Sequence, residues 1–233
     1  MSADGIWAVV PIKEFNGAKQ RLAPLLRPAQ RRELAVVMAE EVLAALAAVS
    51  ALAGIVVVTL DEYATRVAQR IGARVLTDGA RDGHTGAVSA AVRLLARESR
   101  MGMITMPGDI PRITPDEVAA VLAAHRPARS FTIVPAHDDR GSNAVVCSPP
   151  GAVPLKFGND SFMPHLASAR ACRIEPTIVR LPGIAMDIDH PADVDKFVRM
   201  MPPMRTRTLA LLVEFGVVAT MDPRWCGIDW YKN

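Results

Sequence analysis

The sequence contains few cysteines and no block of like charges, and these shortages exclude several classes of protein. Its three cysteines, Cys147, Cys172 and Cys226, lie far apart and show neither a CxxC pair nor a metal-ligand spacing. We therefore expect ordinary thiols in a reducing cytoplasm rather than disulfides. Lys and Arg number 27 against 24 Asp and Glu, a formal net charge of +3, and no basic run suits a nucleic-acid partner.

Long apolar runs and export signals are missing as well. Apolar runs such as residues 55–60 are far shorter than a membrane span. Residues 1–13 lack the basic stretch and long apolar core of a signal peptide. We expect no membrane partner and a cytoplasmic location. Hydrophobic residues make up 50% of the 233 positions, which predicts a packed core in one large domain, with or without an appendage.

Short β-like runs alternate with helical segments along most of the chain. Strands are predicted at residues 6–12, 54–60, 73–76 and 101–106, and helices at residues 28–50, 61–71, 85–98 and from Thr114 onward. This order predicts βαβ units, a largely parallel sheet and helices on both of its faces, which is a three-layer α/β/α fold. Residues 130–135 and 143–147 are predicted strands that form a hairpin or a mixed edge of the sheet. They are followed by a predicted helix at 161–171, an extended segment at 177–181 and a helix at 191–200.

A domain boundary is predicted at Met201-Pro202-Pro203. Residues 1–202 would form the main domain, and residues 203–233 a tail with a partly helical apolar segment at 208–218. The tail is too short to fold alone and carries two of the three tryptophans, so we expect it to dock. Its partner would be the main domain or a second subunit, which makes a homodimer plausible.

Three features follow predicted strands, where ligands of open α/β sheets bind. The first is the loop at residues 11–22, which offers Lys13, Lys19 and Arg21 beside a glycine. Such a loop can neutralise phosphates and supply N–H donors, although it is not a Walker A loop. Charge alone favours a solvated basic loop.

The other two features are carboxylates. Asp109 ends the stretch MPGD, where a turn residue and a metal ligand are equally good readings. Asp187 and Asp189 alternate with apolar residues, so an extended backbone directs both to one side, where they repel unless a cation lies between them. A helix cap before Pro191 would explain Asp189 but not both. Together the three carboxylates could hold Mg²⁺, which suggests phosphoryl or nucleotidyl transfer.

Five stretches carry a family resemblance in their order along residues 6–200. They read VPIKEFNGAKQRLAP, MPGDIPRIT, GSNAVV, KFGNDSF and GIAMDIDHPADV. The set resembles the guanylyltransferases of deazaflavin coenzyme F(420) biosynthesis, which use 2-phospho-L-lactate, phosphoenolpyruvate or 3-phospho-D-glycerate. The resemblance implies a Rossmann-like nucleotidyltransferase fold, GTP as the donor, Mg²⁺ as the cofactor and pyrophosphate as the leaving group. It also implies a downstream transferase as a possible partner.

The resemblance also implies roles for individual residues. Asp109, Asp187 and Asp189 would hold the metals. Lys13, Lys19 and Arg21 would contact the GTP phosphates and, with Asp109, form the catalytic set. Gly83 and Thr85 would lie near the nucleoside, although His84-Thr85 departs from the family's Gly-Leu-Asn-like stretch. Ser142, Gly158 and Ser161 would grip the phosphate of the acceptor.

Two rival functions remain open at this point. One is a related nucleotidyltransferase that uses CTP for molybdopterin cofactors or sugar phosphates. The other is a non-catalytic nucleotide-binding regulator, which is disfavoured because binding alone would not need all three aspartates. Among the histidines, His137 is interpreted as a solvated turn residue and His190 as a helix cap, while His165 could face either way.

Overall fold

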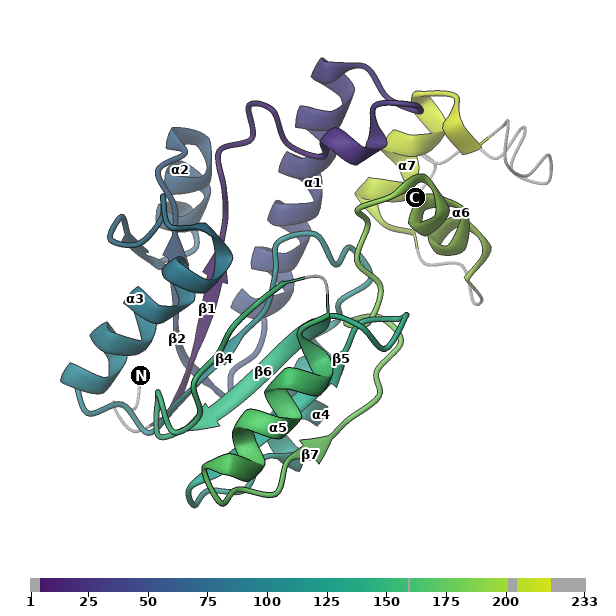
Figure 1. Ribbon diagram of the computed structural model, residues 1–233. Coiled ribbons are helices and arrows are strands. Elements are labelled where there is room, and N and C mark those ends of the chain that lie inside the picture. Colours follow the sequence, from purple (N-terminus) through teal and green to yellow (C-terminus); the bar gives the residue numbers. More distant parts are fainter. Residues whose placement is uncertain (1–4, 159, 201–204, 219–233) are drawn as a thin grey trace.

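The apolar runs of the sequence form one seven-stranded sheet in the computed structural model, which describes residues 5–158, 160–200 and 205–218 (Figure 1). Its strand order is β3-β2-β1-β4-β6-β5-β7. The strands are β1 (Ile6–Pro11), β2 (Leu52–Val58), β3 (Arg74–Leu76), β4 (Gly102–Thr105), β5 (Ser130–Pro135), β6 (Ser142–Ser148) and β7 (Thr177–Ile178). All neighbours pair in parallel except β6, which is antiparallel to both β4 and β5. The predicted mixed sheet and hairpin are confirmed.

Several helices begin at residues whose side chains cap the first turn. The helices are α1 (Pro28–Ala47), α2 (Glu62–Arg70), α3 (Gly83–Arg97), α4 (Pro115–Ala124), α5 (Phe162–Ala171), α6 (Pro191–Arg199) and α7 (Arg207–Glu214). Asp61 accepts the N–H groups of Tyr63 and Ala64 at 2.8 and 3.0 Å and so starts α2. The first helix ends at Ala47 rather than at the predicted residue 50, because the chain turns and enters β2 at Leu52.

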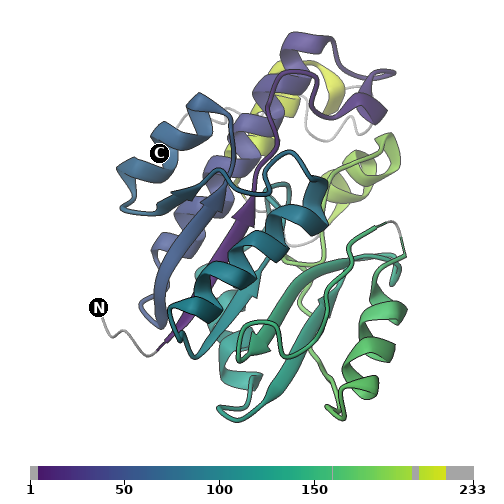
Figure 2. The same ribbon diagram turned by 60° about the vertical axis from the view of Figure 1, so that its left-hand side comes forward.

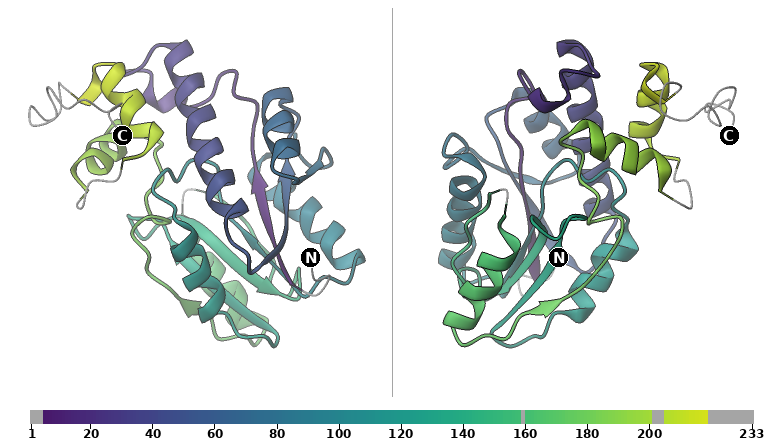
Figure 3. Two further views of the ribbon diagram at one scale, coloured as in Figure 1. Left: turned by 180° about the vertical axis from the view of Figure 1, so that it is seen from behind. Right: turned by 45° about the vertical axis from the view of Figure 1, so that its right-hand side comes forward.

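Helices cover both faces of the sheet, as the strand–helix alternation predicts (Figures 2 and 3). Side chains of β1 alternate between two hydrophobic clusters. Val10 packs with α1, α2 and α4 on one face, and Val9 packs with α3 and α5 on the other. No helix in the described part of the chain is long and apolar enough to cross a membrane.

A third hydrophobic cluster joins α1, α6 and α7 beside one end of the sheet (Figure 1). Helix α7 lies within the predicted tail and also contacts α1 through hydrogen bonds. The Thr208 hydroxyl donates to the Glu41 carboxylate at 2.6 Å. The predicted boundary at 201–203 and the tryptophans of the tail, Trp225 and Trp230, fall on positions 201–204 and 219–233, outside the described residues.

The antiparallel insertion of β6 creates the edge where the candidate site lies. Because β6 runs against β4 and β5, its first residues stand beside the carboxyl ends of those strands. The loops after β1 and β4, the start of β6 and the loop after β5 therefore meet at one edge of the sheet.

The opposite edge holds a buried histidine that sequence reasoning did not single out. His125, directly after α4, is 8% exposed, and its ring nitrogens lie within 3.0 Å of the hydroxyls of Thr132, Ser148 and Ser130. Burial lowers the pKa of His125 to about 4, and it lowers the pKa of the buried His165 to about 4 as well.

These two histidines predict a loss of stability in acid. Below pH 6.5 the unfolded chain binds protons that the folded chain does not bind until about pH 4. The free energy of unfolding should therefore fall as the pH drops from 6.5 to 4, by up to about 3 kcal/mol for each histidine. Urea unfolding of the wild type and of His125→Leu at pH 7 and pH 4.5 measures the contribution of His125 to this loss. An equal fall in the free energy of unfolding in the two proteins would contradict the prediction.

Candidate active site

The basic loop after β1 is folded so that one of its three cations turns inward. Gly17 and Lys19 both adopt left-handed backbone conformations, with φ of 76° and 53°. A positive φ is uncommon for lysine and marks a position that its surroundings enforce. The loop is fixed at its start by the Phe15 N–H, which donates to the Asp61 carboxylate at 3.0 Å.

Lys19 bridges two of the predicted carboxylates. Its Nζ donates to Asp109 Oδ2 at 2.5 Å and to Asp189 Oδ1 at 2.7 Å, and its side chain is only 9% exposed. Burial alone would lower the pKa of Lys19, but the Asp109 and Asp189 charges outweigh it and raise the pKa above its ordinary value. Burial would raise the pKa of Asp189, but Lys19 lowers it. Lys19 and Asp189 are therefore both charged at neutral pH.

Backbone contacts bring residues 187–189 next to Asp109. The Ile188 N–H donates to the Asp109 carbonyl oxygen at 3.1 Å. Just before this segment in the chain, Gly183 and Ile184 donate their N–H groups to the Glu117 carboxylate at 2.8 and 2.7 Å. A Cβ at Gly183 would lie 2.3 Å from the Arg112 carbonyl oxygen, so only glycine fits this approach. Glu117 thus positions the segment that leads to Asp187.

Among the described residues, Asp187 is the one carboxylate of the three without a cationic partner. Its Oδ1 accepts the Asn143 amide at 2.9 Å, and the same amide also donates to the carbonyl oxygens of Ile184 and Ala185. Burial raises the pKa of Asp187 to about 6, and the charges of Asp109 and Asp189 add to this rise while Asn143 opposes it. Like charges are therefore crowded at this point.

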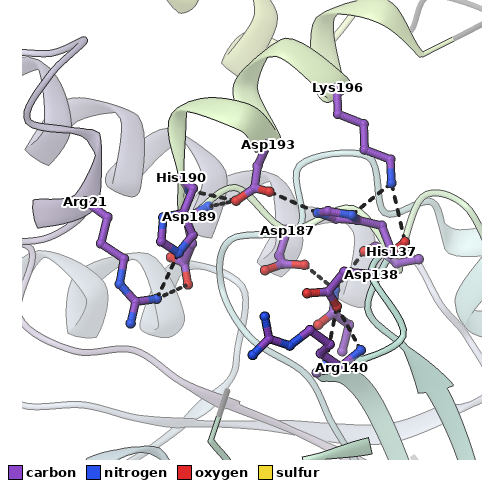
Figure 4. Close-up of polar contacts among 12 residues, drawn as sticks. Arg21, His137, Asp138, Arg140, Asp187, Asp189, His190, Asp193 and Lys196 are labelled. Atoms are coloured by element: carbon purple, nitrogen blue, oxygen red, sulfur yellow. Dashed lines mark hydrogen bonds and ion pairs between the residues drawn. The ribbon is translucent and has the colours of Figure 1, made fainter. Parts of the chain in front are cut away.

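Asp193 fixes the backbone of Asp189 from the other side (Figure 4). Its Oδ2 accepts the N–H groups of Asp189 and His190 at 3.0 and 2.7 Å, and its Oδ1 lies 3.1 Å from His137 Nε2. The Lys196 ammonium donates to His137 Nδ1 at 2.9 Å, so His137 carries its proton on Nε2 and donates to Asp193.

This network changes two interpretations made from the sequence. His137 is half-buried and hydrogen-bonded rather than a solvated turn residue. The side chain of Asp189 binds Lys19 and does not cap α6, whose first turn is closed by Asp193. The sequence does contain a signal for this cap, because Asp193 lies three positions after His190 and an acidic residue at that spacing is typical of a capping box.

The remaining predicted phosphate contacts lie at the rim of this cluster. Arg21 Nη1 is 3.9 Å from Asp189 Oδ2 and 3.3 Å from His190 Nε2 (Figure 4). Lys13 is exposed, and its side chain makes no hydrogen bond or ion pair within residues 5–158, 160–200 and 205–218. Both cations therefore remain accessible to an anionic ligand.

The start of α3 lies between the carboxylates and the loop before α5. Gly83 opens the helix with a φ of 71°, and the Thr85 hydroxyl accepts the Phe157 N–H at 2.9 Å. The His84 ring stacks on Phe157 at 4.3 Å between centroids, and burial lowers its pKa to about 4. An open hollow of about 480 Å³ lies next to this helix start, lined by Leu60, Thr77, Asp78, Gly79, Arg81 and Asp82.

The three residues expected to hold the acceptor lie at the start of β6, for Ser142, and at and just before the start of α5, for Ser161 and Gly158. Ser142 and Ser161 are buried and share a hydrogen bond of 3.2 Å between their hydroxyls. Ser142 Oγ also lies 2.9 Å from His165 Nδ1, so His165 faces inward. Gly158, just before the helix, is exposed.

The structure does not contain a preformed three-ligand metal site in its described part. No group of three His, Cys, Asp or Glu side chains there is arranged to hold an ion. The Lys19 ammonium instead lies between two of the three predicted ligands. Metal binding by Asp109, Asp187 and Asp189 therefore stays a prediction.

Known proteins share this sequence pattern. Residues 6–217 match the family described as "Guanylyl transferase CofC like". The chain is 34% identical over 190 residues to the phosphoenolpyruvate guanylyltransferase of Conexibacter woesei, covering 81% of this chain and 85% of that protein. It is 31% identical over 196 residues to the 3-phospho-D-glycerate guanylyltransferase of Colwellia psychrerythraea, covering 84% and 92%.

Solved structures share the fold. A Desulfovibrio desulfuricans protein assigned to the nucleotide-diphospho-sugar transferases superposes with a TM-score of 0.74 at 17% identity, over 95% of this chain and 99% of that one. A 4-diphosphocytidyl-2C-methyl-D-erythritol synthase gives a TM-score of 0.58 at 12% identity, over 83% and 96%. At these identities the likeness shows the nucleotidyltransferase fold alone, which confirms the predicted fold class.

Proposed function

Because this chain belongs to the CofC-like guanylyl transferase family, we propose that it transfers GMP from GTP to a small phosphorylated carboxylic acid. The acceptor would be phosphoenolpyruvate, 3-phospho-D-glycerate or 2-phospho-L-lactate. Two similar proteins are named for the first two of these acids. The observation that carries the proposal is the Lys19–Asp109–Asp189 cluster at the ligand-binding edge of the sheet, with exposed Lys13 and Arg21 beside it.

The proposed reaction needs no general base. A phosphate monoester has a second pKa of about 6, so its oxygen is already ionised near neutral pH. This oxygen attacks the α-phosphorus of GTP, the bond from that phosphorus to the α–β bridging oxygen breaks, and pyrophosphate leaves with the bonding electrons. The remaining task is to align two polyanions and offset their repulsion. Lys13, Lys19 and Arg21 supply positive charge for this purpose.

The donor set of the site fits Mg²⁺. The ion prefers hard oxygen ligands, and Asp187 shows the crowding of like charges that a divalent cation relieves. Asp109, Asp187 and Asp189 would hold it, with Lys19 displaced toward the phosphates. When bound, Mg²⁺ supplies charge neutralisation at the phosphate oxygens.

The surroundings of the cluster support a proposed placement for each of the two substrates. The open hollow beside the start of α3 would receive the nucleoside. Ser142, at the start of β6, directly precedes Asn143, the partner of Asp187, and shares a hydrogen bond with Ser161 at the start of α5, so this pair would receive the acceptor. The product would be a GDP-linked acid, consumed by a transferase in deazaflavin coenzyme F(420) biosynthesis.

Pyrophosphate release tests this proposal against its rivals. Purified protein is incubated with Mg²⁺ and GTP, CTP or ATP, together with each of the three acids in turn. We expect release with GTP and one preferred acid. Release with CTP and a sugar phosphate would favour the related nucleotidyltransferases, and nucleotide binding without any release would favour a regulator.

A pH dependence of metal binding follows from Asp187. Its carboxylate must be deprotonated to bind Mg²⁺, and its pKa is raised to about 6. Mg²⁺ affinity should therefore be constant above pH 7 and weaken by up to about tenfold for each pH unit well below 6. Calorimetric titrations at pH 7.5 and 5.0 measure this, and Asp187→Asn serves as the pH-insensitive reference. Equal affinity at both pH values would contradict the assignment.

A further inference from the structure

The hydrogen bonds around His165 determine which of its ring nitrogens carries the proton. The Lys156 backbone N–H donates to His165 Nε2 at 3.1 Å. A backbone amide can only donate, so Nε2 is the acceptor and cannot itself be protonated. The neutral imidazole therefore carries its proton on Nδ1, where it donates to Ser142 Oγ at 2.9 Å.

One of the protons around Ser142 has no acceptor within the His165–Ser142–Ser161 group. The His165 Nδ1–H, the Ser142 hydroxyl and the Ser161 hydroxyl supply three protons, but only two hydrogen bonds join these groups. Ser142 Oγ accepts from both His165 and Ser161, so its own proton has no acceptor among these groups. The two serines are 8% and 4% exposed, and a buried hydroxyl proton without an acceptor is costly.

The N-terminus of α5 lies next to this proton. Ser161 is the N-cap residue of α5, yet its side chain makes no cap hydrogen bond, so it is directed to Ser142 instead. The positive end of the helix dipole lies at this point. Thr85 and His165 hold the backbone of Phe157 and Lys156, which fixes the loop immediately before Gly158.

We propose that His165 is a positioning residue that makes the Ser142–Ser161 pair present a free hydrogen-bond donor toward an anionic oxygen of the acceptor. This rests on the proposed function. The opposite tautomer would accept the Ser142 proton and leave no donor for the ligand. The Lys156 amide prevents that tautomer, so the preference for a phosphate or carboxylate oxygen is set by a residue that does not touch the substrate.

Two variants of different hydrogen-bonding capacity test the role of His165. In His165→Leu, Ser142 loses the donor that fixes it and can rotate toward Ser161. We expect the KM for the acceptor to rise about tenfold, with kcat and the KM for GTP changed by less than about threefold. His165→Asn places an amide N–H near the position of Nδ1 and should restore most of the acceptor KM.

His125→Leu is the matched control. His125 is another buried histidine bonded to hydroxyls, but it lies at the opposite edge of the sheet. It should lower stability without changing the acceptor KM. If His165→Leu folds and keeps the wild-type acceptor KM, or if the Asn and Leu variants shift KM equally, the proposal is overturned.

A spectroscopic measurement makes the test independent of turnover. The ¹⁵N ring shifts of His165 in the wild-type protein at pH 7 should report a protonated Nδ1 and a bare Nε2. Inorganic phosphate at millimolar concentration should shift the Nδ1–H and Lys156 amide resonances. If no acid supports turnover, the proposed function fails, whereas an Nε2–H tautomer or the absence of any phosphate-induced shift overturns the positioning role itself.

Discussion

Replacing Asp187 with asparagine is expected to abolish turnover while the fold remains intact. The substitution removes the carboxylate that has no cationic partner in the described part of the chain and whose pKa is raised to about 6 by burial and its acidic neighbours. Losing one of three hard, charged ligands should lower kcat/KM by about a thousandfold or more. Stability should not fall, because the variant relieves repulsion from Asp109 and Asp189. Steady-state pyrophosphate release and urea unfolding measure the two effects.

The control for this variant is Asp116→Asn. Asp116 is exposed in the first turn of α4, and removing its charge should leave turnover unchanged. If Asp187→Asn retained wild-type activity, the assignment of Asp187 as a metal ligand would be wrong. If it unfolded, the carboxylate would be structural rather than functional.

Replacing Lys19 with methionine is expected to change activity and metal affinity in opposite directions. The wild-type ammonium lies between Asp109 and Asp189 at 2.5 and 2.7 Å, where it competes with a divalent cation. Without it, Mg²⁺ should bind the protein alone more tightly, by about tenfold. Turnover should still fall by about a hundredfold or more, because a cation that offsets the phosphate charges is lost.

Calorimetry and pyrophosphate release on the same preparations separate these effects. In EDTA the Lys19→Met protein should be less stable than the wild type, because two carboxylates lose their partner. Adding Mg²⁺ should remove this difference in stability. Arg97→Met removes the same charge from an exposed position of α3 and is the matched control. Weaker Mg²⁺ binding by Lys19→Met would show that Lys19 does not share the site with the ion.

The sequence was sufficient to predict the architecture and to point to the edge of the sheet where the candidate site lies. Strands such as β1 and β2 are short apolar runs followed by capped helices, and local patterns of this kind predict a doubly covered sheet. The alternation of Asp187 and Asp189 with apolar residues is also local. It predicted that both carboxylates point to one side, and the position of Asp109 after β4 follows from strand order alone.

Contacts between distant segments could not be predicted in this way. The Lys19 pairs join residues 90 and 170 positions apart in the sequence, and they depend on a left-handed backbone at Lys19 that no local signal indicates. The supports from Glu117, Asn143 and Asp193 likewise arise only after the sheet has formed. His165 has two possible orientations on a helical pattern, and only the fold shows that it faces Ser142.

The central claim is that an acceptor phosphate oxygen attacks the α-phosphorus of GTP at this site. It is tested most directly by supplying the preferred acid with its phosphate labelled with ¹⁸O and analysing both products by mass spectrometry. The account predicts a GDP-linked acid that retains every labelled oxygen, together with unlabelled pyrophosphate. Labelled pyrophosphate, or GMP formed without any GDP-linked acid, would contradict it.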